Sequence, residues 1–256
     1  MNIVVILKQT FDTEEKIIIE NGEVVNDNAQ LIINPYDEYA VEEAVKLKEV
    51  HGGEVTVITL GRSEAESALR TALAMGADNA VLIENEDELS LDEQGIAKIL
   101  AAAIKERDFD IILGGNMSVD NGASQVGPRI AEELGIAHVA TIMKLEIKDS
   151  FVKVERDVEG DLEIIESGLP ILVTAQQGLN EPRYPSLPGI MKAKKKPLER
   201  LDIEDLDISE DDLQPKSKII DHYLPKKKEA GQILKGDIQA QVKELVLLLH
   251  GDIKPV

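Results

Sequence analysis

The sequence contains no cysteine among its 256 residues, and it contains only four histidines. Without thiols, disulfide bonds, thiolate metal sites and catalysis by a cysteine nucleophile are excluded for this chain. The histidines His51, His138, His222 and His250 are scattered without the spacing of metal ligands. No metal site is therefore expected.

Long apolar runs and positive charge are also scarce. No run approaches the ~18 consecutive apolar residues of a membrane span, so no membrane insertion is expected. The first residues, MNIVVILK, enter a strand almost at once, which predicts no signal or transit peptide. Asp and Glu number 49 against 28 Lys and Arg, a net charge of −21 that argues against a nucleic-acid partner. A soluble, cytoplasmic protein is expected.

The order of apolar runs predicts the fold. Buried strands are expected near residues 3–7, 55–60, 80–83, 109–113 and 170–175, with helices between the first four. Such alternation predicts a parallel sheet covered on both faces. Four short runs at 139–142, 144–147, 152–157 and 162–166 predict an antiparallel extension. We therefore expect an α/β, three-layer sandwich with a mostly parallel, Rossmann-like sheet, this extension and a C-terminal arm.

The last quarter of the chain differs in composition. Residues 198–213 are strongly acidic, which we interpret as a linker or arm rather than part of a packed core. A helix is expected from about Asp237 to His250, with one apolar face that either a partner subunit or the chain's own sheet must cover. The predicted division is an α/β domain at 1–197 and an arm with its helix at 198–256.

A glycine-rich loop follows the strand that ends at Leu113: it runs from Gly114 to Gly127 as GGNMSVDNGASQVG. In parallel sheets, ligands bind beyond the carboxyl ends of the strands. Ser124 and Gln125 offer side-chain donors, and the start of the following helix suits a phosphate. The loop is neither a Walker loop nor a GxGxxG fingerprint, so a simple turn remains an alternative. Likewise, Asp120 is either a ligand contact or a helix cap.

The stretch from Leu169 to Pro197 is the most unusual in composition. After its apolar strand, Gly178, Pro182, Pro185, Pro188 and Gly189 predict a loop without regular structure. The apolar side chains of this loop are Leu179, Tyr184, Leu187, Ile190 and Met191, and the lysines that follow are Lys192, Lys194, Lys195 and Lys196. Apolar anchors beside a basic cluster predict a docking surface for an acidic partner. The alternative is that the lysines merely solvate a helix start.

Part of this stretch resembles a known family. Asn180-Glu181-Pro182-Arg183-Tyr184, Leu187-Pro188 and the run from Ile190 to Lys196 resemble the signature of the electron-transfer flavoprotein small (beta) subunit. Further similarity lies at Lys8 to Asp12, Asn34 to Ala44, Arg70 to Asp78 and Val154 to Asp157. Together these segments cover roughly residues 3 to 200.

The resemblance implies an electron carrier rather than an enzyme, with a sheet of the adenine-nucleotide-binding type and no catalytic residue. It implies AMP on this chain and FAD at the interface with the large (alpha) subunit, so that redox chemistry comes from the flavin. The implied partners are the large subunit and acyl-CoA or related dehydrogenases. The implied cofactor-binding positions are Ile6, Asn34, Pro35, Tyr36, Asp37, Leu60, Gly115, Asn116, Asp120, Asn121, Gly122, Ala123, Ser124, Gln125 and Val126. The implied docking positions are Leu187, Ile190, Met191, Lys192, Lys194 and Lys195.

Two alternatives stay open at this point. The sequence Gln125 to Pro128 resembles members that bifurcate electrons, hold a second FAD in place of AMP and have an NADH site. Gln9 stands where many relatives have arginine, which puts contacts from this segment to a partner's flavin in doubt. A stand-alone adenine-nucleotide-binding, stress-type domain would share the fold, but it would have no reason to keep the loop after Pro182.

Overall fold

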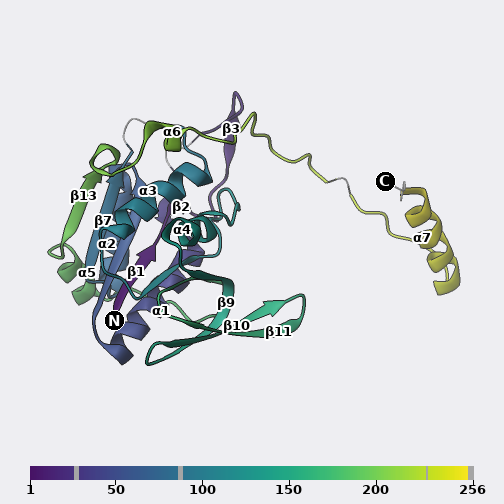
Figure 1. Ribbon diagram of the computed structural model, residues 1–256. Helices are drawn as coiled ribbons and strands as arrows, with labels where there is room; N and C mark the ends of the chain where they lie inside the picture. Colours follow the sequence, from purple (N-terminus) through teal and green to yellow (C-terminus); the bar gives the residue numbers. More distant parts are fainter. Residues whose placement is uncertain (26–28, 86–88, 229, 253–256) are drawn as a thin grey trace. The chain divides into compact units, whose positions relative to one another are not determined.

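The computed structural model describes residues 1–25, 29–85, 89–228 and 230–252. It divides into a large unit, Met1–Ile18 with Val25–Ile220, and a small unit, Ile19–Val24 with Asp221–Val256. The strands of the chain (Figure 1) are β1 Asn2–Ile6, β2 Gln9–Phe11, β3 Ile18–Glu20, β4 Glu23–Val25, β5 Leu31–Ile33, β6 Glu54–Gly61, β7 Asn79–Glu84, β8 Ile111–Gly115, β9 Ala137–Lys148, β10 Phe151–Val158, β11 Asp161–Gly168, β12 Ile171–Ala175 and β13 Leu198–Asp202. The helices are α1 Pro35–His51, α2 Glu66–Met75, α3 Glu93–Lys105, α4 Val126–Leu134, α5 Leu187–Ala193, α6 Glu210–Leu213 and α7 Ile238–Asp252, with short 3-10 turns η1 Ser63–Ala65 and η2 Ile203–Asp205.

The central sheet of the large unit confirms the predicted fold class. Within the described residues it has nine strands in the order β11-β10-β9-β12-β8-β1-β6-β7-β13. β1 pairs in parallel with β6 on one side and with β8 on the other. The chain therefore builds outward from β1 first in one direction and then, after β7, in the other. That reversal creates a switch point between β1 and β8, where open α/β sheets bind their ligands.

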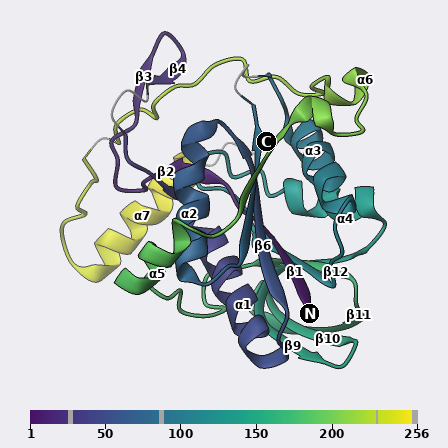
Figure 2. The same ribbon diagram turned by 90° about the vertical axis from the view of Figure 1, so that its left-hand side faces the viewer.

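Helices cover both faces of the sheet, because its strands are apolar on both sides. Alternate residues of β1 face opposite layers: Ile3 and Val5 belong to the core beneath α1 and α2, and Val4 and Ile6 to the core beneath α3 and α4. Figure 2 shows the α1–α2 pair and the α3–α4 pair on opposite sides of the sheet. The three-layer arrangement follows from this alternation.

The antiparallel extension is present, but its first part differs from the prediction. The two short strands expected at 139–142 and 144–147 are one 12-residue strand, β9. Thr141 has a positive φ of 58° within it, and the pairing of β9 with β12 shifts register there. A β-bulge places an extra residue in a strand without ending the strand. In the sequence, this irregularity looked like a break between two strands.

The acidic segment 198–213 is not a linker, and that prediction is wrong. Its first five residues form β13, which pairs in parallel with β7 along its whole length. Ile203 beyond it is buried in the core beneath α3 and α4. β13 is an edge strand, and the exposed charges of Glu199 and Arg200 suit a sheet edge, where they discourage pairing with another chain. The charged residues at the start of this segment therefore belong to a strand at the edge of the sheet and not to an unpacked linker.

The loop after β12 also contains a regular element that the prolines and glycines were expected to exclude. α5 begins at Leu187, and the Ser186 hydroxyl accepts a hydrogen bond from the Gly189 amide at 3.1 Å. Pro188 lies in the first turn, where its missing N–H has no intrahelical acceptor to lose. The helix is thus compatible with its proline, because the proline is at its start.

The small unit contains a hairpin turn at Asn21 and Gly22 and the predicted C-terminal helix. Asn21 and Gly22 both have positive φ, 55° and 81°, as a tight hairpin turn requires. His222 Nδ1 lies 3.2 Å from the Gly22 carbonyl oxygen. α7 matches the expected 237–250 helix closely, and its Val242, Leu245 and Leu249 side chains are exposed. In the part of the chain that the structure describes, no helix combines the length and apolarity needed to cross a bilayer.

Candidate functional site

A pocket lies at the carboxyl edge of the central strands, beside the switch point. It is bounded by the end of β1, by Leu60 of β6, by the start of α1, by α3 and by the loop from β8 to α4. The lining residues are Ile6, Leu7, Lys8, Asn34, Asp37, Leu60, Ile96, Leu100, Gly115, Asn116, Met117, Ser118, Asn121, Ala123, Ser124, Gln125, Val126 and Gly127. The lining thus combines an apolar wall, formed by Ile6, Leu60, Ile96 and Leu100, with side-chain amides and hydroxyls.

Asp37 joins three elements beneath the pocket. It lies in the first turn of α1, where one carboxylate oxygen accepts from the Lys8 amide at 2.7 Å and the other from the Gly115 amide at 2.8 Å. Burial raises the pKa of Asp37 to about 7, although the two amide donors act in the opposite direction. Its side chain therefore fixes the ends of β1 and β8 relative to α1.

Asn34 holds the glycine-rich loop in the same manner. Its Nδ2 donates to the Met117 carbonyl at 2.8 Å, and its Oδ1 accepts from the Val119 amide at 3.1 Å. A buried side-chain amide that uses both ends on one loop defines that loop's position. The Asn34 and Asp37 side chains thus shape the pocket by binding backbone groups of the protein itself.

Two glycines are required by close packing at this site. A Cβ on Gly115 would lie 2.3 Å from Asp37 Oδ1 and 2.7 Å from the Tyr36 Cβ. A Cβ on Gly127 would lie 2.8 Å from the Thr174 methyl group. Any side chain at either position would push the loop or α4 away from the sheet, so the pocket depends on both glycines.

The N-terminus of α4 faces the pocket through Val126 and Gly127. The first amides of a helix have no intrahelical acceptor, and Pro128 has no N–H, so these two amides are the donors of the turn. No acidic residue lies in this first turn. The Gln125 side chain does not cap the helix, and its Oε1 accepts a hydrogen bond from Arg129 Nη2 at 2.7 Å. The helix end is therefore suited to an anionic group.

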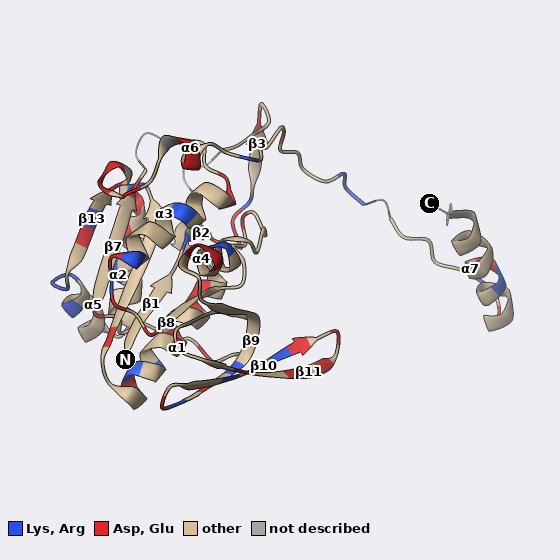
Figure 3. Ribbon diagram, in the orientation of Figure 1, with Lys and Arg blue, Asp and Glu red and all other residues tan. Residues whose placement is uncertain are grey.

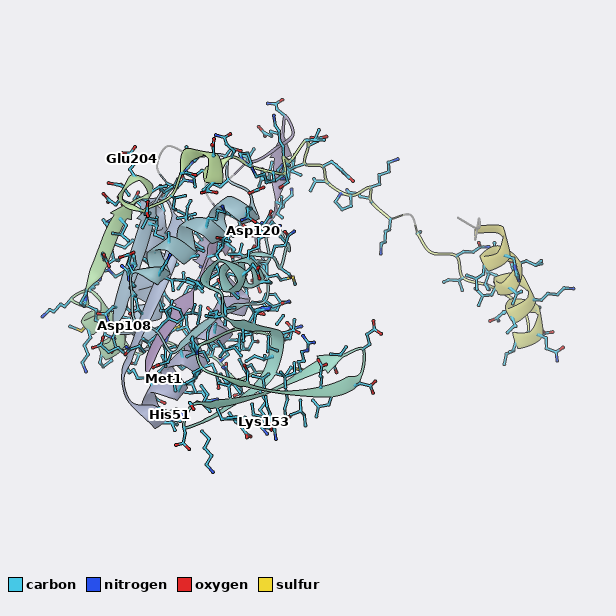
Figure 4. All side chains as sticks on the ribbon, viewed as in Figure 1. Met1, His51, Asp108, Asp120, Lys153 and Glu204 are labelled. Carbon is cyan, nitrogen blue, oxygen red and sulfur yellow. The ribbon has the colours of Figure 1, made fainter. Side chains whose placement is uncertain are left out.

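Lys8, a lining residue of the pocket, forms an ion pair with Asp120, with Nζ 2.5 Å from Oδ2. Burial alone would raise the pKa of Asp120, but the charge and hydrogen bond of Lys8 outweigh it and lower that pKa. Asp120 (labelled in Figure 4) lies in the loop before α4 and is no helix cap: it pairs with the end of β1. The pair neutralises the one acidic side chain of this loop.

The structure brings most of the expected cofactor-binding residues together. Eleven of the fifteen line the pocket: Ile6, Asn34, Asp37, Leu60, Gly115, Asn116, Asn121, Ala123, Ser124, Gln125 and Val126. The other four surround it: Pro35 and Tyr36 open α1, Asp120 binds Lys8, and Gly122 lies at an exposed loop tip with φ 63°.

Sequence reasoning missed several lining residues, chiefly Ile96 and Leu100 of α3. Their apolar spacing was visible, but core and pocket residues share one helix face, so spacing alone does not separate them. Lys8, Met117 and Ser118 also line the pocket, and each lies within two residues of an expected position in the sequence.

The expected docking residues are gathered on α5 and the turn after it. Leu187 is 79% exposed and Met191 72%, and Ile190 is also exposed. Lys192, Lys194 and Lys195 are exposed beside them, and Figure 3 shows basic residues at this helix. Lys196 differs from its neighbours, since its Nζ donates to the carbonyls of Leu73 at 3.0 Å and Ala77 at 2.5 Å. It therefore caps the end of α2 and belongs to the fold.

The run Asn180 to Arg183 attaches this surface to α1. Asn180 Nδ2 donates to the Tyr39 carbonyl and to Glu43 Oε2, both at 2.9 Å. Arg183 donates to the buried Glu42 at 2.8 Å and to Glu49 at 2.7 Å. The carboxylates of Glu49 and Glu42 raise the already high pKa of Arg183 further. These residues thus attach the segment that leads to α5 to helix α1.

Neither the pocket nor the surface contains a metal cluster. Across the described residues, no three His, Asp or Glu side chains approach closely enough to hold an ion.

Comparison with known proteins identifies the family. Residues 22–206 match the electron transfer flavoprotein domain. The chain is 58% identical to an electron transfer flavoprotein subunit beta of Bacillus subtilis, over the full length of both chains. It is 41% identical to that of Thermoanaerobacterium thermosaccharolyticum over 98% of each chain, and 34% identical to the mitochondrial one of Oryza sativa over 99% of each. The chain therefore belongs to the electron transfer flavoprotein family as a beta subunit, an electron carrier rather than an enzyme.

Proposed function

We propose that this beta subunit binds AMP in the pocket at the switch point and serves as the small subunit of a cytoplasmic heterodimer. The observation that carries the proposal is the α4 N-terminus, which has no acidic residue in its first turn and opens into a pocket with an apolar wall. An aromatic base suits the apolar wall, and a phosphate suits the helix end.

The residues divide the binding between them. Leu60, Ile96 and Leu100 supply apolar contact for a base. Ser118, Ser124 and Asn121 supply polar groups for a ribose, and the Val126 and Gly127 amides suit the phosphate. None of these groups carries out chemistry on the nucleotide, so AMP has a structural role.

The large (alpha) subunit is the partner in this heterodimer, with FAD held at the interface between the subunits. The bound flavin supplies the redox chemistry: it takes electrons from acyl-CoA or related dehydrogenases and passes them to a quinone-reducing or other acceptor system. The exposed Leu187 and Met191 on α5 contact the dehydrogenase, and the lysines beside them steer an acidic partner. This places the chain in electron transport, and in fatty acid oxidation when acyl-CoA is the substrate.

One alternative within the family is a bifurcating subunit with a second FAD in place of AMP and an NADH site. The sequence Gln125 to Pro128 favours it, and three of its residues form the start of α4 at the pocket. A stand-alone adenine-nucleotide-binding domain is disfavoured by the exposed apolar side chains of α5 and α7, which need partners.

The deciding experiment is to purify the chain with its large subunit and to identify and count the released nucleotides. We expect one FAD and one AMP per heterodimer. Two FAD and no AMP would establish the bifurcating alternative, and a stable monomer that ignores the large subunit would exclude both.

A further inference from the structure

The first turn of α3 is hydrogen bonded to two other segments. One is the pocket loop, residues 116–125 between β8 and α4, and the other is residues 216–217, where the C-terminal arm begins. Asp92 caps α3, its Oδ1 accepting from the Gln94 and Gly95 amides, both at 3.1 Å. Its second oxygen, Oδ2, accepts from the Lys216 amide at 2.6 Å and the Ser217 amide at 3.0 Å. One carboxylate therefore fixes the helix start and the chain 124 residues further on.

The anchored residues lie where the chain leaves the large unit. That unit ends at Ile220, three residues beyond Ser217, and the following segment leads to α7. A second contact supports the anchor, since Lys98 of α3 pairs with Asp212. The start of the arm is thus held by α3 through backbone amides, which any sequence at 216–217 other than proline would provide.

The same turn holds the pocket loop through its next two residues. Asn121 Nδ2 donates to Glu93 Oε1 at 3.4 Å. Arg129 donates to Gln94 Oε1 through one guanidinium nitrogen and to Gln125 Oε1 through another. Asn121 and Gln125 line the pocket, as does Ile96 one turn into α3. Hydrogen bonds therefore join the pocket loop to the turn that carries Asp92.

We propose that the first turn of α3 couples the pocket to the arm, so that a phosphate-bearing adenine nucleotide in the pocket and large-subunit binding by the arm strengthen each other. The element with two states is the 216–217 segment, which is either hydrogen bonded to Asp92 or released. Because the coupling is an equilibrium property, it is reciprocal: the nucleotide tightens the heterodimer by the factor by which the large subunit tightens the nucleotide. The inference rests on the proposed AMP site.

The structure offers a variant that separates the two roles of Asp92. In Asp92→Asn, the side-chain oxygen still caps α3, since Asn is as good an N-cap as Asp. The amide nitrogen that replaces Oδ2 cannot accept from Lys216 and Ser217. Gln94→Ala makes the complementary change, because it leaves the Asp92 anchor and removes the side-chain hydrogen bonds of Gln94 to Arg129 and Glu133 of α4. Glu132→Gln, an exposed residue of α4, is the control for the loss of one negative charge.

The test uses the full chain and the purified large subunit. AMP binding is measured by calorimetry, hydrogen exchange at the 216 and 217 amides by mass spectrometry, and heterodimer affinity with and without AMP. In the wild type and in Glu132→Gln, AMP should slow exchange at these amides and tighten the heterodimer by about threefold to tenfold. In Asp92→Asn and in Gln94→Ala the effect of AMP on the heterodimer should vanish, while AMP still binds.

The outcomes distinguish the coupling from the site. If AMP binds and tightens the heterodimer equally in all four proteins, the coupling does not run through this turn and the proposal is overturned. If AMP does not bind the wild-type chain, the pocket assignment fails and the coupling fails with it. Unchanged exchange at 216 and 217 in Asp92→Asn would show that the anchor itself is absent in solution.

Discussion

Arg183 and Glu42 form a partly buried ion pair that ties the segment after β12 to the middle of α1. Arg183 Nε lies 2.8 Å from Glu42 Oε2, and Nη2 lies 3.1 Å from Oε1. The Glu42 side chain is only 7% exposed. The position of α5 therefore depends on an ion pair that lies outside that helix.

Arg183→Ala should destabilise the chain by about 1–3 kcal/mol, because it leaves the Glu42 carboxylate buried without its charged partner. Glu49→Gln is the control: it removes the exposed carboxylate of the same cluster and should cost less than about 1 kcal/mol. Urea unfolding of the three proteins measures both values. Equal costs for the two variants would contradict the assigned role of Glu42.

Leu187→Ala should weaken electron transfer from a dehydrogenase without changing flavin content or chain stability. The side chain is exposed in this chain, so its truncation removes no internal packing. If it is buried by the partner, the loss should be roughly 1–3 kcal/mol of binding free energy. Val50→Ala, an equally exposed apolar residue at the end of α1, is the matched control. A Leu187 variant that loses flavin but transfers electrons normally would show that α5 is structural.

Replacing Lys194 and Lys195 together by Gln should lower the association rate with an acidic partner. The effect should be largest at low salt and fade as ionic strength rises, since exposed charges act through a screened field. The double variant Lys105→Gln with Lys148→Gln removes the same charge elsewhere on the surface and should have a smaller effect. Stopped-flow kinetics over a salt series tests this, and identical salt slopes for the two variants would exclude steering by α5.

The buried carboxyl of Asp37 should make stability depend on pH. Its pKa is about 7 in the folded chain, against about 3.9 in an unfolded one. Between these values the folded chain binds the extra proton, so the stability that Asp37 contributes is present at low pH and is lost as pH rises through 7. Relative to Asp37→Asn, the wild type should lose about 2–3 kcal/mol of unfolding free energy between pH 5 and 8. Asp108→Asn, an exposed aspartate, is the control, and a pH-independent difference for Asp37→Asn would refute the shift.

The end of the large unit determines where the arm can be removed. Truncation after Pro197 deletes β13 from the sheet and should destabilise the whole unit. Truncation after Ile220 leaves the sheet complete and removes residues 221–256, which include α7. We expect the second form to stay folded, by thermal unfolding, and to bind the large subunit more weakly. Unchanged subunit affinity in that form would exclude the arm from the interface.

The sequence predicted the sheet and the edge that carries the pocket, because apolar strands alternate with helices and the glycine-rich loop follows β8. It did not predict what Asn34 and Asp37 bind. Their partners at Gly115 and Met117 lie about 80 residues away and are backbone groups, which no side-chain pattern reveals. It also failed at β13 and α5, where composition suggested unpacked chain. In both places the position within the fold, a sheet edge or a first helical turn, made unfavourable residues acceptable.

Lys196 and Arg70 have a consequence for how such chains diverge. They attach α5 to α2, Lys196 through the carbonyls of Leu73 and Ala77 and Arg70 through those of Ala193 and Lys196. All these acceptors are main-chain oxygens, which persist whatever side chains surround them. The exposed positions of α5 are therefore free to vary while the helix keeps its place. The surface chemistry of α5 can change on this scaffold without any change at the pocket beside β1 and β8.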